Sequence, residues 1–157
     1  MTTAPLIRID NLSVTFSGEH EPVQALKDAS LDILPGETLA LVGESGSGKS
    51  VTAHSILRLL PYPQASHPTG RILYKDDDLL QMPEKRLRQI RGNRISMIFQ
   101  EPMSSLNPLH SVERQINEVL LLHKGLGKHA ARARTLELLH LVGLPEPEKR
   151  LNAYPHE

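Results

Sequence analysis

The sequence predicts an α/β fold in which an antiparallel β-subdomain comes first, a glycine-rich loop joins a buried strand to a helix, and a mainly helical part follows. Three observations predict this fold. Apolar and polar residues alternate along two N-terminal segments, the pattern G-x-x-x-x-G-K-S follows a short apolar run, and helical spacing dominates the last third of the chain. We therefore expect a sheet that carries an anion-binding loop.

The first half of the chain is expected to form a hairpin and then a strand–loop–helix unit. Alternation over residues 6–16 predicts a half-buried strand, and alternation over residues 25–34, which ends at a Pro-Gly turn, predicts its antiparallel neighbour. Residues 37–42 (ETLALV) are mostly apolar, as a strand buried on both faces would be. Residues 50–60 follow the helical period and end at Pro61.

The second half adds short strands and then amphipathic helices. Pro83 opens a charged segment, as proline often does in the first turn of a helix. Gly125 and Gly127 separate two segments with helical spacing of apolar residues. The expected elements are strands at 70–74 and 95–99 (ISMIF), helices at 83–91, 112–123 and 128–142, and loops at 61–68, 100–108 and 145–147.

Charge and composition exclude several classes of function. Lys plus Arg and Asp plus Glu both number 18, so the chain lacks the positive charge of a protein that coats nucleic acid. It has no Cys, which excludes disulfides and zinc–thiolate sites, and its 8 His show no metal-type spacing. The apolar runs are far shorter than the roughly 18 residues that cross a bilayer, and the start lacks a signal-peptide pattern. We expect a cytoplasmic protein without a nucleic-acid partner.

The glycine-rich loop over residues 43–50, called the P-loop below, carries the predicted chemistry. Its glycines let successive backbone N–H groups turn inward around phosphate oxygens. Lys49 supplies positive charge for the outer phosphates, Ser50 offers a hydroxyl to Mg²⁺, and the following helix directs its positive dipole end at the same anion. A chance turn is the alternative, and the strand before and helix after the loop argue against it. The predicted nucleotide-binding residues here are Gly43, Glu44, Ser45, Gly46, Ser47, Gly48, Lys49, Ser50 and Val51.

A P-loop alone does not separate GTPases, nucleotide kinases and transport ATPases. Here about 40 residues of β-pattern precede it, and three segments are distinctive: LSVTF, ALKDASLDILPGETLALVGESGSGKSVTA and ISMIFQEPMSSLNPLHSV. Together they resemble the ATP-binding subunits of ABC peptide importers, of the oligopeptide, dipeptide and microcin uptake type, from about Leu6 to Glu157. The resemblance implies a P-loop NTPase fold of the ABC ATPase type. It implies a β-subdomain and P-loop strand at 6–42, P-loop and helix at 43–60, a strand and Q-loop at 95–108, and a helical subdomain at 109–157.

The resemblance also implies site residues outside the P-loop. Phe16 lies where the family has an aromatic side chain that stacks on adenine, with a plain core phenylalanine as the alternative. Gln100 matches the Q-loop glutamine, a ligand or water-holder near the metal. The implied ligands are ATP and Mg²⁺, with Ser50 and Gln100 as metal contacts. The implied partners are transmembrane permease subunits and a second ATP-binding domain, at the cytoplasmic face of the inner membrane.

The family's catalytic set is expected to be incomplete within residues 1–157. In the family a segment like YPHE, here residues 154–157, is followed by an LSGGQ signature, a Walker B strand and a switch histidine, and none of these occurs in the 157 residues. We expect a truncated domain whose ATP turnover alone does not exceed that of a Lys49→Ala control. Two alternatives stay open, a soluble ABC-type ATPase that acts on nucleic acid or ribosomes and a noncatalytic truncated nucleotide-binding product.

Overall fold

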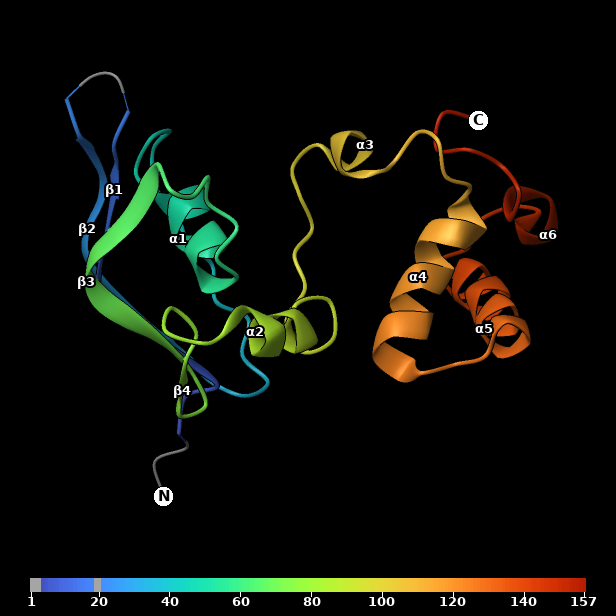
Figure 1. The fold of residues 1–157 in the computed structure, drawn as a ribbon, viewed down its shortest axis with the longest axis horizontal. Helices are drawn as coiled ribbons and strands as arrows, with labels where there is room; N and C mark the ends of the chain where they lie inside the picture. The colour runs from blue at the N-terminus through green and yellow to red at the C-terminus, as the bar shows by residue number, and fades with distance from the viewer. Residues whose placement is uncertain (1–3, 19–20) are drawn as a thin grey trace. The chain divides into compact units, whose positions relative to one another are not determined.

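The computed structural model describes residues 4–18 and 21–157 and divides the chain into two compact units, residues 1–88 and 89–157. The first unit holds a sheet and helix α1, and the second is helical (Figure 1). Helix α2 (Glu84–Ile90) begins in the first unit and ends in the second. The other elements are β1 (Ile7–Phe16), β2 (Val23–Ile33), α1 (Lys49–Ile56), β3 (Ala65–Tyr74), β4 (Asp77–Asp78), α3 (Pro102–Ser105), α4 (Val112–Lys124), α5 (Lys128–Leu141) and α6 (Pro147–Arg150).

The sheet of the first unit is antiparallel throughout, with strand order β2-β1-β3-β4. The predicted hairpin of the first two strands is confirmed. Strand β3 is longer than predicted, because it begins at Ala65, which pairs with Phe16 at the end of β1, and not at Gly70. Residues 65–69 at the start of β3 (ASHPT) lack the alternation of a strand. The neighbouring backbone of β1 supplies the hydrogen bonds that hold them extended.

Strand β1 contains an irregularity that its apolar pattern already shows, since Ile9 and Leu12 are three positions apart. Asn11 and Leu12 lie opposite Gly70 alone on β3, which makes a β-bulge. Asn11 has a φ of 48° and Gly70 a φ of 92°. The extra residue shifts the alternation by one, so that Leu12 and Val14 continue the buried face that begins at Ile9.

The core of the first unit is aliphatic, as the composition predicts. Helix α1 lies on one face of the sheet (Figure 1) and buries Thr52 and Ser55. Burial of the apolar side chains of this core, about 25 cal/mol per Å² of apolar surface, is the main stabilising contribution. The largest fully buried apolar side chains are Ile9, Leu12, Val14, Ile72, Leu79 and Leu87.

Two predicted strands do not form, at residues 37–42 and 95–99. Most of their apolar side chains are exposed, with Val42 at 88% and Ile98 at 95%, and Ile95 and Met97 are half-buried. A strand buried on both faces needs hydrogen-bonding neighbours along its edges, and neither segment has a neighbouring strand in the part of the chain that the structure describes. The prediction of two formed strands was therefore wrong.

The second unit is built on the two predicted amphipathic helices. The N-cap of helix α4 is Ser111, whose Oγ accepts a hydrogen bond from the Arg114 backbone N–H at 3.4 Å. Helices α4 and α5 pack together, and the Thr135 hydroxyl donates to Asn117 Oδ1 at 2.7 Å in their interface. Helix α6, which the sequence did not predict, begins at Pro147 within the stretch 145–147 that was expected to be loop. Helix α3 likewise lies within the expected loop 100–108, so both loop predictions were wrong in part. No helix within 4–18 and 21–157 is both long and apolar enough to cross a bilayer.

A histidine of β3 forms a hydrogen bond with a serine of α1. His67 Nε2 lies 3.2 Å from Ser55 Oγ, and that hydroxyl donates to the Val51 carbonyl at 2.8 Å. Because the Ser55 hydroxyl already donates its hydrogen, it accepts the hydrogen bond from the Nε2–H of His67. Burial lowers the pKa of His67, and the nearby charge of Arg58 lowers it further.

This lowered pKa predicts that acid weakens the first unit. The unfolded chain takes up a proton at His67 near the ordinary value of about 6.5, whereas the folded chain takes it up only at lower pH. The free energy of unfolding should therefore fall as the pH drops from about 6.5 through the folded pKa. Urea unfolding of the wild type and of His67→Gln at about pH 7.5 and about pH 5.5 measures it. An equal pH dependence in both proteins would contradict the assignment, and exposed His129→Gln is the control.

Candidate functional site

Within the P-loop of the first unit, Gly48 is fixed between β2 and α1. Gly48 is the N-cap of α1, with φ 90° and ψ 1°. A Cβ at this position would lie 2.8 Å from Leu26 Cδ1 and 3.1 Å from the Ala25 carbonyl oxygen. The Gly48 carbonyl accepts hydrogen bonds from the backbone N–H of Thr52 at 2.8 Å and from its hydroxyl at 2.9 Å. Both the close approach and the positive φ require glycine here.

The Lys49 ammonium lies inside the curve of the P-loop. Its Nζ donates hydrogen bonds to the Gly43 carbonyl at 2.8 Å, to the Glu44 carbonyl at 2.5 Å and to Ser47 Oγ at 3.1 Å. The P-loop therefore holds the ammonium group that is predicted to contact the phosphates. An anion at this position would replace neutral oxygens with charged ones, and such charge-assisted hydrogen bonds are roughly twice as strong.

The P-loop residues fit a chain of phosphates. The first N–H groups of α1, at and after Lys49, have no acceptor within the helix and are available to an anion. A Cβ on Gly46 would meet no atom within 4 Å, so there is open space beside the loop. Ser50 is exposed in the first turn of α1, whereas Val51 is half-buried and its carbonyl serves Ser55.

The P-loop also fits Mg²⁺ held together with phosphate oxygens. The Ser50 hydroxyl is one hard oxygen ligand, and Mg²⁺ commonly takes only one or two protein ligands beside phosphates and water. Within the described ranges no three acidic, His or Cys side chains gather into a metal cluster.

Two predicted site residues lie outside the P-loop. Phe16 is half-buried at the end of β1, in the same unit as the P-loop, and pairs with Val23 and Ala65. Gln100 is exposed in the second unit, after residues 95–99 and before α3. The stacking role of Phe16 and the metal role of Gln100 remain predictions.

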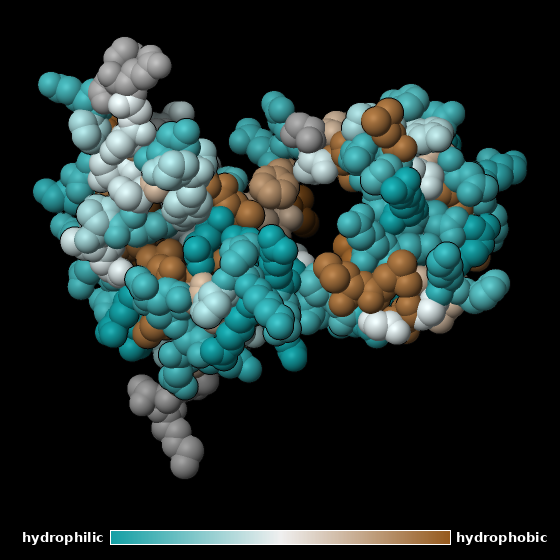
Figure 2. Space-filling view, viewed as in Figure 1, coloured by the Kyte–Doolittle hydropathy of each residue, from teal (hydrophilic) through white to brown (hydrophobic). Residues whose placement is uncertain are grey.

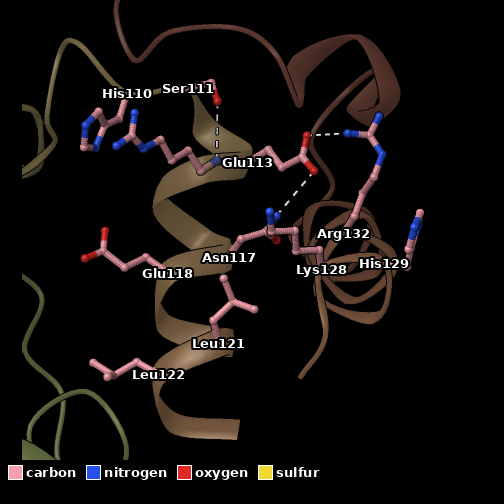
Figure 3. A pocket seen from close by; sticks show the side chains of 11 residues that line it. His110, Ser111, Glu113, Asn117, Glu118, Leu121, Leu122, Lys128, His129 and Arg132 are labelled. Carbon is pink, nitrogen blue, oxygen red and sulfur yellow. Dashed lines mark hydrogen bonds and ion pairs between the residues drawn. The ribbon is translucent and has the colours of Figure 1, made fainter. Parts of the chain in front are cut away.

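The second unit has a cavity of about 1080 Å³ along α4 and the start of α5, whose residues the sequence did not single out (Figure 3). Glu113 lines this cavity, accepts a hydrogen bond from Asn117 Nδ2 at 3.3 Å and forms an ion pair with Arg132. Leu121 continues the same face of α4 one turn further. The signal in the sequence was the spacing of Glu113, Asn117 and Leu121 by four residues, which places them in one row.

Comparison with known proteins extends over nearly the whole chain. A family model described as ABC transporter matches residues 26–157. The chain is 61% identical over 155 residues to the peptidoglycan transport ATP-binding protein YejF of Agrobacterium fabrum, a match over 99% of this chain and 28% of that protein. It is 47% identical over 152 residues to the oligopeptide transport ATP-binding protein OppD of Bacillus subtilis, over 97% of this chain and 42% of that protein.

Solved structures show the same fold. The dimeric post-hydrolysis structure of the ATP-binding cassette MJ0796 bound to ADP and Pi superposes with a TM-score of 0.79 at 26% identity. That match covers 96% of this chain and 62% of the other. Among the curated relatives cited, this chain spans 28% to 42% of their length.

Proposed function

The chain belongs to the ABC transporter family, and from this premise we propose that it binds ATP as part of an ATPase subunit that powers peptide uptake. Both the family and the α/β fold of an ABC ATPase agree with what the sequence predicted. The observation that carries the proposal is the P-loop, in which Lys49 Nζ lies among three loop oxygens and Gly48 admits no side chain. The relatives named for peptide transport support the choice of cargo.

The described residues would bind and orient the phosphates. The Lys49 ammonium would neutralise the outer phosphates, and the free N–H groups at the start of α1 would direct their partial positive charge at the same oxygens. Bound MgATP would supply the free energy for transport through phosphoryl transfer to water, a reaction that rests on positioning and electrostatic stabilisation. Ser50 and Gln100 are the proposed metal contacts.

The proposed partners are transmembrane permease subunits and a second ATP-binding domain. The helical second unit, with its cavity along α4, is the proposed surface for the permease, and the relatives named as transport proteins support this. The proposed location is the cytoplasmic face of the inner membrane, as a peripheral subunit. A DNA- or ribosome-directed ATPase would not be expected to have relatives of this kind.

Reconstitution tests the proposal. The full-length protein, co-expressed with peptide permease subunits, should co-purify with them and, in right-side-out membrane vesicles, drive uptake of a labelled oligopeptide only when MgATP is enclosed in the vesicles. Uptake without ATP, or stable association with ribosomes or DNA in place of membrane subunits, would overturn the transport assignment.

The Phe16 prediction separates base recognition from phosphate recognition. We expect Phe16→Ala to raise the ATP dissociation constant several-fold, equivalent to about 1 kcal/mol of lost stacking, while Phe16→Tyr binds normally. Displacement of a fluorescent ATP analogue measures both. Because Phe16 also closes the end of β1, the melting temperature of each variant is the control for folding. Normal ATP binding by a folded Phe16→Ala protein would show that the ring belongs to the core only.

A further inference from the structure

Leu26 of β2 is the side chain on which the P-loop rests. A Cβ on Gly48 would lie 2.8 Å from Leu26 Cδ1 and 3.9 Å from Leu26 Cβ, so the glycine packs directly against this leucine. Leu26 is itself half-buried and pairs with Val14, which is fully buried in the sheet. The P-loop therefore contacts, at Gly48, a leucine of the sheet that is paired with a fully buried residue.

The opposite side of Gly48 is held by α1. Both the N–H and the hydroxyl of Thr52 donate to the Gly48 carbonyl, and Thr52 is 4% exposed. The next residue is Lys49, whose ammonium lies among the loop oxygens. A displacement of Gly48 away from Thr52 or toward β2 would thus move the lysine and the free N–H groups together.

We infer that Leu26 is a positioning residue for the phosphate site, which acts through Gly48 and contacts no nucleotide atom itself. The inference rests on the proposed ATP-binding function and deepens it. A strand of the β-subdomain, and not only the P-loop sequence, then sets the curvature of the phosphate cradle.

The physical reason is that glycine cannot fill the space that a shortened leucine would leave. Core truncations leave a gap that the surroundings close only in part, and here the most yielding wall of the gap is the loop backbone. Phosphate binding depends on several donors that converge on one anion, so a small shift of the loop weakens all of them at once. Displacements of about 1 Å in a catalytic arrangement cost on the order of a hundredfold in rate.

Inorganic tripolyphosphate distinguishes this role from a role in base binding, because it carries the phosphate chain without adenine. In the full-length protein, Leu26→Ala should raise the dissociation constants of ATP and of tripolyphosphate by the same factor, about tenfold, which corresponds to about 1.4 kcal/mol of binding free energy. Leu26→Met, which restores the volume, should bind both ligands like the wild type. Phe16→Ala should weaken ATP alone.

The matched control is Leu31→Ala, a half-buried leucine of the same strand that pairs with Ile9. It should lower the melting temperature as Leu26→Ala does, yet leave both dissociation constants unchanged. If Leu26→Ala changes ligand binding no more than Leu31→Ala does, or weakens ATP but not tripolyphosphate, the inference is wrong. If the wild type binds neither ligand, the proposed function itself fails, and the inference fails with it.

Discussion

Lys49→Ala in the full-length protein should weaken ATP binding and abolish ATP hydrolysis. The ammonium is held among three P-loop oxygens in the structure. Lys49 is the one Lys or Arg within residues 43–50, so it is the positively charged side chain that the P-loop offers to the outer phosphates. Its removal should cost about 2 to 3 kcal/mol of binding, the value of a charge-assisted hydrogen bond, or roughly 30-fold or more in the dissociation constant. The loss in turnover should be larger, because charge on the transferred phosphoryl group must also be stabilised in the transition state.

Two variants make this experiment specific. Lys27→Ala removes an exposed lysine of β2 outside the P-loop and should hydrolyse ATP at the wild-type rate. Lys49→Arg keeps the charge, but its planar, wider head group does not match three acceptors arranged around one ammonium, so it should remain impaired. Phosphate release in the presence of Mg²⁺ measures turnover. Hydrolysis by Lys49→Ala at the wild-type rate would refute the P-loop assignment.

Gly70→Ala should be among the most destabilising single substitutions in the first unit. A Cβ at this position would lie 2.5 Å from the Asn11 carbonyl oxygen and 2.5 Å from Leu12 Cα, and these are backbone atoms of the neighbouring strand. The φ of 92° adds conformational strain for any residue with a side chain. Overpacking and strain together should lower the free energy of unfolding by about 3 kcal/mol or more.

Gly36→Ala is the matched control, because it shares the positive φ but not the crowding. Gly36 has a φ of 75°, and a Cβ there would meet nothing within 4 Å. Its substitution should cost only the conformational term, about 1 kcal/mol. Urea unfolding of both variants separates the two contributions. Equal losses in the two proteins would show that strand β1 moves away from residue 70 at little cost.

The sequence predicted the features whose cause lies in neighbouring residues. The alternation of the two N-terminal strands, the glycines of the P-loop, and the separation of α4 from α5 at Gly125 depend on local pattern and backbone preference. The start of β3 could not be predicted in this way. Residues 65–69 (ASHPT) lack the alternation of a strand, and their extended conformation depends on pairing with β1, which is remote in sequence.

The incorrect strands at 37–42 and 95–99 show the opposite case. Their composition satisfies the pattern of a buried strand, but a strand forms only where neighbouring backbone is present to pair with it. The site shows the same division. Lys49 and Gly48 are placed by contacts within or beside the P-loop, as the motif predicts, whereas the contribution of Leu26 from β2 carries no sequence signal and is visible only in the structure.

The bulge in β1 has a consequence for how the strand tolerates changes in length. Asn11 is the extra residue on both sides of the strand, because Asp10 pairs with Arg71 and Ser13 with Thr69 on β3, while Ile9 pairs with Leu31 and Leu12 with Ala29 on β2.

In a chain without Asn11 this irregularity would be absent on both sides of β1, and Ile9, Leu12 and Val14 would follow one another at every second position. Asn11 thus has the character of a one-residue insertion that the sheet absorbs as local twist. A homologous strand that is shorter by this one residue would therefore keep the buried side chains of Ile9, Leu12 and Val14 on one face of the sheet.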